Sequence, residues 1–179
     1  LVYGAIRYGK GIHFLLEAVK KSNIKKKFKI IIAGKQDNPT KKIIDTYKKD
    51  SKFKDILITL NYFISIDLQD YLFRKTSVIW TGTTKNYYGS SGVFFLSAKY
   101  KKPVITSDHG LINLYTKKYK IGYRVEIDNI NKIKKLLKNV LSGSKKIPNS
   151  YFKKVNQSHN SEIFSENIIR KLNLKFIRF

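Results

Sequence analysis

The sequence contains no cysteine and no methionine, and acidic residues are scarce. Without cysteine, neither a disulfide nor a thiolate metal site is possible, which fits a reducing compartment. Asp and Glu together number 12 against 37 Lys and Arg, so the formal net charge is +25 at pH 7. No apolar run approaches the roughly 20 residues that a membrane-spanning helix needs, and no secretory signal is visible. The absence of cysteine excludes a disulfide scaffold, and no stretch of this sequence predicts a membrane-spanning helix.

The chain of 179 residues suits one domain with a real core. Because it begins at Leu1 and has no methionine, we expect it to be a fragment of a longer protein. The breakers Ser142-Gly143-Ser144 and Pro148 divide it into a main domain, residues 1–143, and a tail, residues 144–179. In the tail, Ser161 is expected to cap a last helix whose apolar residues are Ile163, Phe164, Ile168 and Leu172.

The positive charge consists mostly of lysine, and arginine occurs only at Arg7, Arg74, Arg124, Arg170 and Arg178. Readers of nucleic-acid sequence use the bidentate arginine fork, which is rare in this chain. The sequence therefore favours a solvated lysine surface with weak attraction to polyanions or acidic lipids. No specific nucleic-acid partner is expected.

Short β-branched runs alternate with helical patterns along the main domain. This alternation predicts a Rossmann-like α/β fold, a parallel sheet of about six strands with helices on both faces. The expected strands are residues 1–3, 28–33, 56–63, 77–80, 104–106 and 122–125. The expected helices begin near Gly11, Asn38, Asp67, Ser91, Gly110 and Asp128. In such a sheet, ligands bind beyond the carboxyl ends of the strands.

One stretch at that edge, Gly89-Ser90-Ser91-Gly92-Val93, is a loop of small residues that opens a helix. Ser90 or Ser91 is expected to cap this helix through its hydroxyl. Free N–H groups, flanking glycines and the helix dipole favour an anion such as phosphate. An ordinary capped loop explains the same residues equally well.

The loop that opens the chain, Gly4 to Gly11, also follows a strand and begins a helix. It nearly matches a P-loop, but Gly11 stands where Ser or Thr would hold magnesium, so that interpretation is weak. Arg7 and Lys10 beside glycines still make a candidate phosphate clamp. The alternative is a plain strand–helix turn with solvated cations.

Several catalytic arrangements are missing. No Asp or Glu occurs between Tyr71 and Ser107, which leaves nothing for a paired-carboxylate glycosidase in the glycine loop. The sequence has no Gly-x-Ser-x-Gly elbow, and His13, His109 and His159 lack metal-ligand spacing. We therefore predict no metal site and leave the catalytic residues unassigned.

Taken together, these stretches resemble the C-terminal half of a GT-B glycosyltransferase of the large retaining family 4. The matching segments cover roughly residues 1–141 and are Gly4 with Lys10-Gly11-Ile12, Leu15 to Ala18, Ile30 to Gly34, Tyr62-Phe63-Ile64, Ser90-Ser91-Gly92-Val93, Ala98 with Lys102 to Ile105, and Ser107-Asp108-x-Gly110. The resemblance implies a donor-binding domain for a nucleotide sugar, and an acceptor domain N-terminal to this chain. It implies no cofactor besides the UDP- or GDP-sugar substrate.

The resemblance also implies roles for single residues. Lys10 matches a member of the basic pair that holds the diphosphate, and Arg7 stands in for the arginine that Ala5 replaces. The base is expected near Tyr62 and Phe63. The other residues that the resemblance places in the binding site for the nucleotide sugar are Gly11, Ser90, Ser91, Gly92, Val93 and Ser97.

Two glutamates of the family pattern fall at Gly89 and Ser97 and are missing here. The second glutamate normally grips the ribose hydroxyls, and a serine makes only part of that contact. The Ser-Ser-Gly-Val form resembles a subgroup in which these acids are commonly lost.

The resemblance implies a hexosyltransferase-type enzyme of bacterial surface polysaccharide or lipopolysaccharide assembly, with a saccharide or lipid-linked acceptor. We expect a cytoplasmic protein at the inner face of the cell membrane, and we expect this chain alone to be inactive. Two alternatives remain: a basic polyanion- or nucleic-acid-binding module without activity, and a sheet that keeps only an interaction role.

Overall fold

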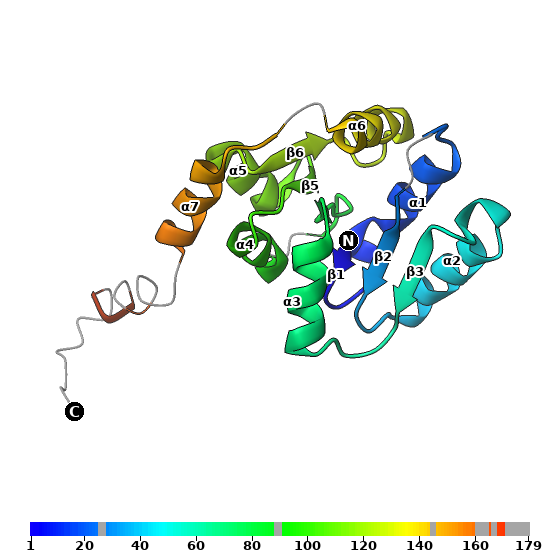
Figure 1. Cartoon of the computed structure of the whole chain (residues 1–179), viewed down its shortest axis with the longest axis horizontal. Coiled ribbons are helices and arrows are strands. Elements are labelled where there is room, and N and C mark those ends of the chain that lie inside the picture. The colour runs from blue at the N-terminus through cyan, green and yellow to red at the C-terminus, as the bar shows by residue number, and fades with distance from the viewer. Residues whose placement is uncertain (25–27, 88–90, 144–145, 160–164, 166–167, 171–179) are drawn as a thin grey trace.

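The computed structural model describes residues 1–24, 28–87, 91–143, 146–159, 165 and 168–170 (Figure 1). Six parallel strands form one sheet in the order β3-β2-β1-β4-β5-β6. The strands are β1 (Val2–Tyr3), β2 (Ile30–Ala33), β3 (Leu57–Leu60), β4 (Ile79–Trp80), β5 (Val104–Ser107) and β6 (Gly122–Val125). The predicted Rossmann-like sheet is confirmed.

The strand order reverses direction at β1, which pairs with β2 on one side and β4 on the other. Val2 of β1 is in register with Ile32 of β2 and with Trp80 of β4. The chain therefore leaves β1 toward one edge of the sheet and later returns to build the other edge. The carboxyl ends of β1 and β4 border the crevice that this topology creates.

Helices cover both faces of the sheet (Figure 1). Buried side chains of α1 (Ile12–Lys20), α2 (Asn38–Lys48) and α6 (Ile130–Ser142) share one core cluster with the sheet. The other face is covered by α3 (Ile66–Lys75), α4 (Gly92–Lys99), α5 (Gly110–Tyr119) and α7 (Asn149–Ser158). Two one-turn 3-10 helices, Tyr8–Lys10 and Ser51–Phe53, lie in loops.

The helices form because apolar residues recur at helical spacing. In α1, Ile12, Leu15, Leu16 and Val19 are all at most 5% exposed and pack against the sheet. Several starts are capped as elementary chemistry requires: the side chains of Asp37, Ser65 and Asn129 accept from N–H groups of the first turns of α2, α3 and α6.

The third strand is shorter than expected from residues 56–63 and ends at Leu60. Its last partner is Gly34 N–H, which donates to Leu60 O at 2.9 Å. Beyond that point the neighbouring strand has turned away, and Asn61 Oδ1 accepts from Gln36 N–H instead. The apolar run Tyr62 to Ile64 therefore continues as a loop.

The helix α7 is absent from the sequence-based expectation. Phe152 and Val155 on this helix are buried against α4 and α5. The expected last helix beginning at Ser161 lies largely outside the described residues, because Ile163, Phe164 and Leu172 are among those not described. The boundary at residue 143 stays a prediction.

None of the helices in the described part of the chain combines the length and apolar character that crossing a membrane requires.

Candidate functional site

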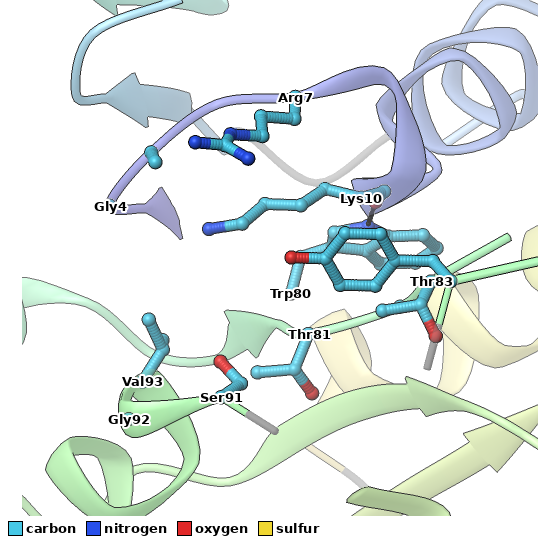
Figure 2. Close-up of a pocket in the computed structure, with 12 residues that line it drawn as sticks. Gly4, Arg7, Lys10, Trp80, Thr81, Thr83, Ser91, Gly92 and Val93 are labelled. Atoms are coloured by element: carbon cyan, nitrogen blue, oxygen red, sulfur yellow. Dashed lines mark hydrogen bonds between the residues drawn. The ribbon is translucent and has the colours of Figure 1, made fainter. Parts of the chain in front are cut away.

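A pocket of about 400 Å³ opens at the carboxyl ends of β1 and β4 (Figure 2). Three segments line it: Gly4, Ala5, Arg7 and Lys10 of the first loop (residues 4–11), residues 80–83 and Tyr87 from the end of β4 and the loop after it, and residues 91–93 at the start of α4. The structure thus brings together Arg7, Lys10, Ser91, Gly92 and Val93, as expected from the topology.

The first loop follows a fixed path because its backbone is held to the end of β2. Gly4 N–H donates to Ala33 O at 3.0 Å, and Ile6 N–H donates to Lys35 O at 2.9 Å. Gly4 has φ +91°, a conformation that glycine adopts most cheaply. The loop then closes in a 3-10 turn at Tyr8–Lys10 and enters α1.

Lys10 is held at both ends by hydrogen bonds. Its Nζ donates to Tyr3 O, the last carbonyl of β1, at 2.6 Å. Its own carbonyl accepts from Trp80 Nε1 at 2.9 Å. A β-carbon on Gly4 would lie 3.4 Å from Lys10 Nζ, so the glycine leaves room for the ammonium group. The ammonium is therefore positioned at the crevice and is not freely mobile.

The charge on Lys10 is uncompensated inside the pocket. Burial, and secondarily the nearby positive charge of Arg7, lower the pKa of Lys10 from 10.5 to about 8. None of the described residues that line the pocket is an Asp or Glu. An anion that binds in the pocket would contact two cations. Its negative charge would raise the pKa of Lys10 back toward the ordinary lysine value.

The start of α4 faces these cations across the pocket (Figure 2). Ser91 is the N-cap residue, and its hydroxyl makes no capping hydrogen bond; Ser90, the other residue expected to cap this helix, lies outside the described residues. The backbone carbonyl of Ser91 accepts from Phe94 N–H at 3.0 Å. The first N–H groups of any helix lack partners within the helix, so those of Gly92 and Val93 are suited to an anion.

The loop after β4 supplies most of the wall that the sequence-based assignment missed, through Thr81, Gly82, Thr83 and Tyr87, and Trp80 at the end of β4 completes it. This loop folds over the first loop, where Thr84 N–H donates to Gly9 O at 2.9 Å and a β-carbon on Gly9 would meet the Tyr87 ring. Its position after a central strand was the available signal, because every such loop lies at the carboxyl edge.

The other predicted binding residues do not line this pocket. Gly11, with φ +59°, ends the 3-10 turn and precedes α1. Tyr62 and Phe63 lie after β3, with 52% and 91% of their surface exposed. Ser97 is fully buried, and its Oγ donates to Val93 O at 2.6 Å, so its hydroxyl is used by the helix backbone. Ser90 lies outside the described residues.

Among the described residues, no group of three or more His, Asp or Glu side chains lies close enough together to hold a metal ion. The pocket is lined by two cations, Arg7 and Lys10, by the N-terminus of α4, and by the aromatic rings of Trp80 and Tyr87 in its wall. Chemically, this arrangement suits an anion that carries several oxygens, such as a diphosphate, better than a neutral substrate.

The family model described as "Glycosyl transferases group 1" matches residues 1–157 of this chain. Comparison with curated proteins found no match.

Solved structures share the fold at low identity. HepE from Anabaena, crystallised with UDP and glucose, matches with TM-score 0.77 and 14% identity over 96% of this chain and 48% of HepE. The lipopolysaccharide outer core galactosyltransferase WaaB matches with TM-score 0.74 and 15% identity over 98% of this chain and 49% of WaaB.

The C-terminal domain of LpcC, a glycosyl transferase group 1 protein from Francisella tularensis, matches with TM-score 0.65 and 18% identity over 87% of this chain and 78% of that domain. The chain therefore spans about half the length of HepE and WaaB, and most of an isolated C-terminal domain.

Proposed function

The chain belongs to the glycosyl transferases group 1 family, and we propose that its pocket binds the diphosphate of a nucleotide-sugar donor. One observation carries this proposal: Lys10, partly buried and without an acidic partner in the pocket, faces the N-terminus of α4 across a hollow of about 400 Å³. HepE was crystallised in complex with UDP and with UDP-glucose, which supports a uridine nucleotide as the first ligand to test.

In the proposed complex, Lys10 and Arg7 contact the phosphates from one side. The N–H groups of Gly92 and Val93 approach them from the other side. When the sugar departs, negative charge develops on the nucleotide, and these preorganised donors would stabilise it without a metal ion. The nucleoside would extend along the carboxyl edge toward the loop at Tyr62 and Phe63.

The finer assignment follows the same proposal. We propose a retaining hexosyltransferase that acts on a saccharide or lipid-linked acceptor in the assembly of a bacterial surface polysaccharide or lipopolysaccharide. The acceptor would be bound by a second domain. The net charge of +25 supports a cytoplasmic position on the inner face of an anionic membrane.

Isothermal titration calorimetry with UDP, GDP, UDP-glucose and GDP-mannose tests the proposal. Loss of one charge-assisted contact costs roughly 1.5–3 kcal/mol, so Lys10→Ala should weaken binding by about ten- to a hundredfold. The matched control is Lys42→Ala on the exposed surface of α2, which removes the same charge far from the pocket. It should leave the affinity within about twofold.

Two results would contradict the proposal. The first is the absence of binding by every nucleotide tested. The second is an equal loss in Lys10→Ala and Lys42→Ala, because nucleotide would then respond only to the overall charge of the protein.

A further inference from the structure

A second hollow lies on the same face of the sheet as α3 and α4, at the opposite end of these helices from the pocket. It measures about 610 Å³ and is lined by Asp70, Arg74, Lys99, Tyr100, Lys101 and Lys102, here called the basic groove. Helices in a parallel α/β sheet run opposite to the strands, so the carboxyl ends of α3 and α4 lie at the amino edge of the sheet. The basic groove is therefore separate from the proposed donor pocket.

Asp70, the acidic residue of the basic groove, already accepts hydrogen bonds from other residues of the groove. Asp70 Oδ2 accepts from Arg74 Nε at 2.6 Å, and Asp70 Oδ1 accepts from Tyr100 OH at 2.9 Å. Arg74 also lies over the Tyr100 ring, with 5.8 Å between its Cζ and the ring centroid. The carboxylate thus orients the guanidinium, and the lysines of the groove contribute positive charge in excess of it.

Lys102 is anchored in the wall. Its Nζ donates to Arg74 O, the carbonyl in the last turn of α3, at 2.8 Å. Burial lowers the pKa of this partly buried amine. The hydrogen bond links the ends of α3 and α4 and fixes the shape of the basic groove.

Lys101 occupies a backbone position that suits glycine. It has φ +53°, in the left-handed region. Its N–H donates to Ala98 O at 3.0 Å, and Lys102 N–H donates to Ser97 O at 2.8 Å. These two bonds form a Schellman motif, whose left-handed residue is usually glycine because a β-carbon is unfavourable there.

The side chain of Lys101 also borders a neighbouring hollow. That hollow measures about 440 Å³ and is lined by Lys101, Asn149, Ser150, Lys153, Asn156 and Gln157. Its lysines and amides are donors that phosphate oxygens accept from. Lys101 therefore lies between two adjoining hollows with the same donor chemistry.

We propose that the basic groove is a second anion site that binds a phosphate-bearing ligand, with Lys101 as its central contact. The ligand class is a phosphate or diphosphate group, supplied by a soluble molecule or by a lipid headgroup. Four of the six residues that line the groove are cationic, its carboxylate is already hydrogen-bonded to Arg74 and Tyr100, and Lys101 borders both hollows.

The test compares two substitutions that make the same change to the backbone. Lys120 also has positive φ, +56°, at the end of α5, and it lines neither hollow. Lys101→Gly and Lys120→Gly each remove one charge and relieve one left-handed residue. Both should leave the melting temperature of the 179-residue chain unchanged or higher.

Binding of inorganic pyrophosphate is measured by calorimetry at about 0.15 M salt, in the Lys10→Ala background so that the contribution of the donor pocket is reduced. We expect Lys101→Gly to weaken binding at least about fivefold and Lys120→Gly to change it less than about twofold. Equal losses, or no pyrophosphate binding by the parent protein together with no vesicle binding, would overturn the proposal.

The source of the phosphate is distinguished by a second probe. Flotation with vesicles of phosphatidylglycerol and phosphatidylcholine is compared with vesicles of phosphatidylcholine alone. Selective loss of vesicle binding in Lys101→Gly assigns the site to a lipid headgroup. Selective loss of pyrophosphate binding alone assigns it to a soluble phosphate.

Discussion

Lys10 combines a fixed position with an unfavourable charge. Its ammonium group is held by Tyr3 O, and burial together with Arg7 lowers its pKa to about 8. Because the folded-state pKa lies below the ordinary value, the charged form is penalised in the unliganded fold. That penalty is fully present below pH 8 and disappears as the pH rises toward the ordinary lysine pKa. A bound anion removes the same penalty, so binding and protonation of Lys10 are coupled.

This coupling predicts a pH dependence of nucleotide binding. The protonated fraction of a group with pKa 8 falls about tenfold between pH 7 and pH 9, so the UDP affinity should fall by about the same factor. Phosphate groups with a pKa near 6 are already about 90% ionised at pH 7, so their own titration changes the affinity little over this range. Calorimetry across the range measures the effect.

The matched variant for this measurement is Lys10→Arg, whose side chain stays charged and should bind UDP with a flat pH profile. An undiminished pH step in Lys10→Ala would assign the titration to another group and contradict the interpretation.

At the scale of single elements, the pocket depends on how closely β1 and β2 meet at their carboxyl ends. Gly34 follows β2 with φ +134°, and a β-carbon there would lie 1.9 Å from Gly4 O. Gly34→Ala must therefore displace the start of the first loop. We expect a loss of about 2–4 kcal/mol in the free energy of unfolding, measured by urea denaturation, and weaker UDP binding.

Gly143→Ala is the control for that substitution. Gly143 ends α6 with φ +73°, and a β-carbon there meets nothing within 4 Å. It should cost only about 1 kcal/mol of stability and leave UDP binding unchanged. Equal effects of the two substitutions on UDP binding would show that the contact between Gly34 and Gly4 does not shape the pocket.

The elements that could be predicted are those whose own residues determine them. The run Ile30–Ala33 is buried on both faces, and the stripe of α1 has helical spacing, so local pattern was sufficient. By contrast, α7 has only Phe152 and Val155 as buried residues, and no side chain caps it at Pro148. Its helix is stabilised by packing against α4 and α5, which local pattern does not reveal.

The site was predictable to the extent that topology places it. Arg7, Lys10 and residues 91–93 follow β1 and β4, so the strand order brings them to one crevice. The wall formed by Trp80 and Tyr87 depends on a loop folding back onto Gly9, a tertiary contact without a sequence period. The hydroxyl of Ser97 was expected to contact the ribose. It instead donates to Val93 O, the carbonyl four residues earlier in the same helix.

At the scale of the whole molecule, binding and transfer are expected to separate. The described residues lining the pocket include no Asp, Glu or His that would serve as an acid or base, and the chain spans about half the length of HepE and WaaB. We therefore predict that the 179-residue chain binds UDP-glucose or GDP-mannose without releasing nucleoside diphosphate.

Release is measured by a coupled assay for UDP and GDP, with binding followed by calorimetry on the same preparation. Release above the protein-free blank that disappears in Lys10→Ala would contradict this prediction, because the chain would then catalyse the reaction by itself. Binding without release would assign the remaining catalytic and acceptor-binding groups to a second domain, as the proposed function requires.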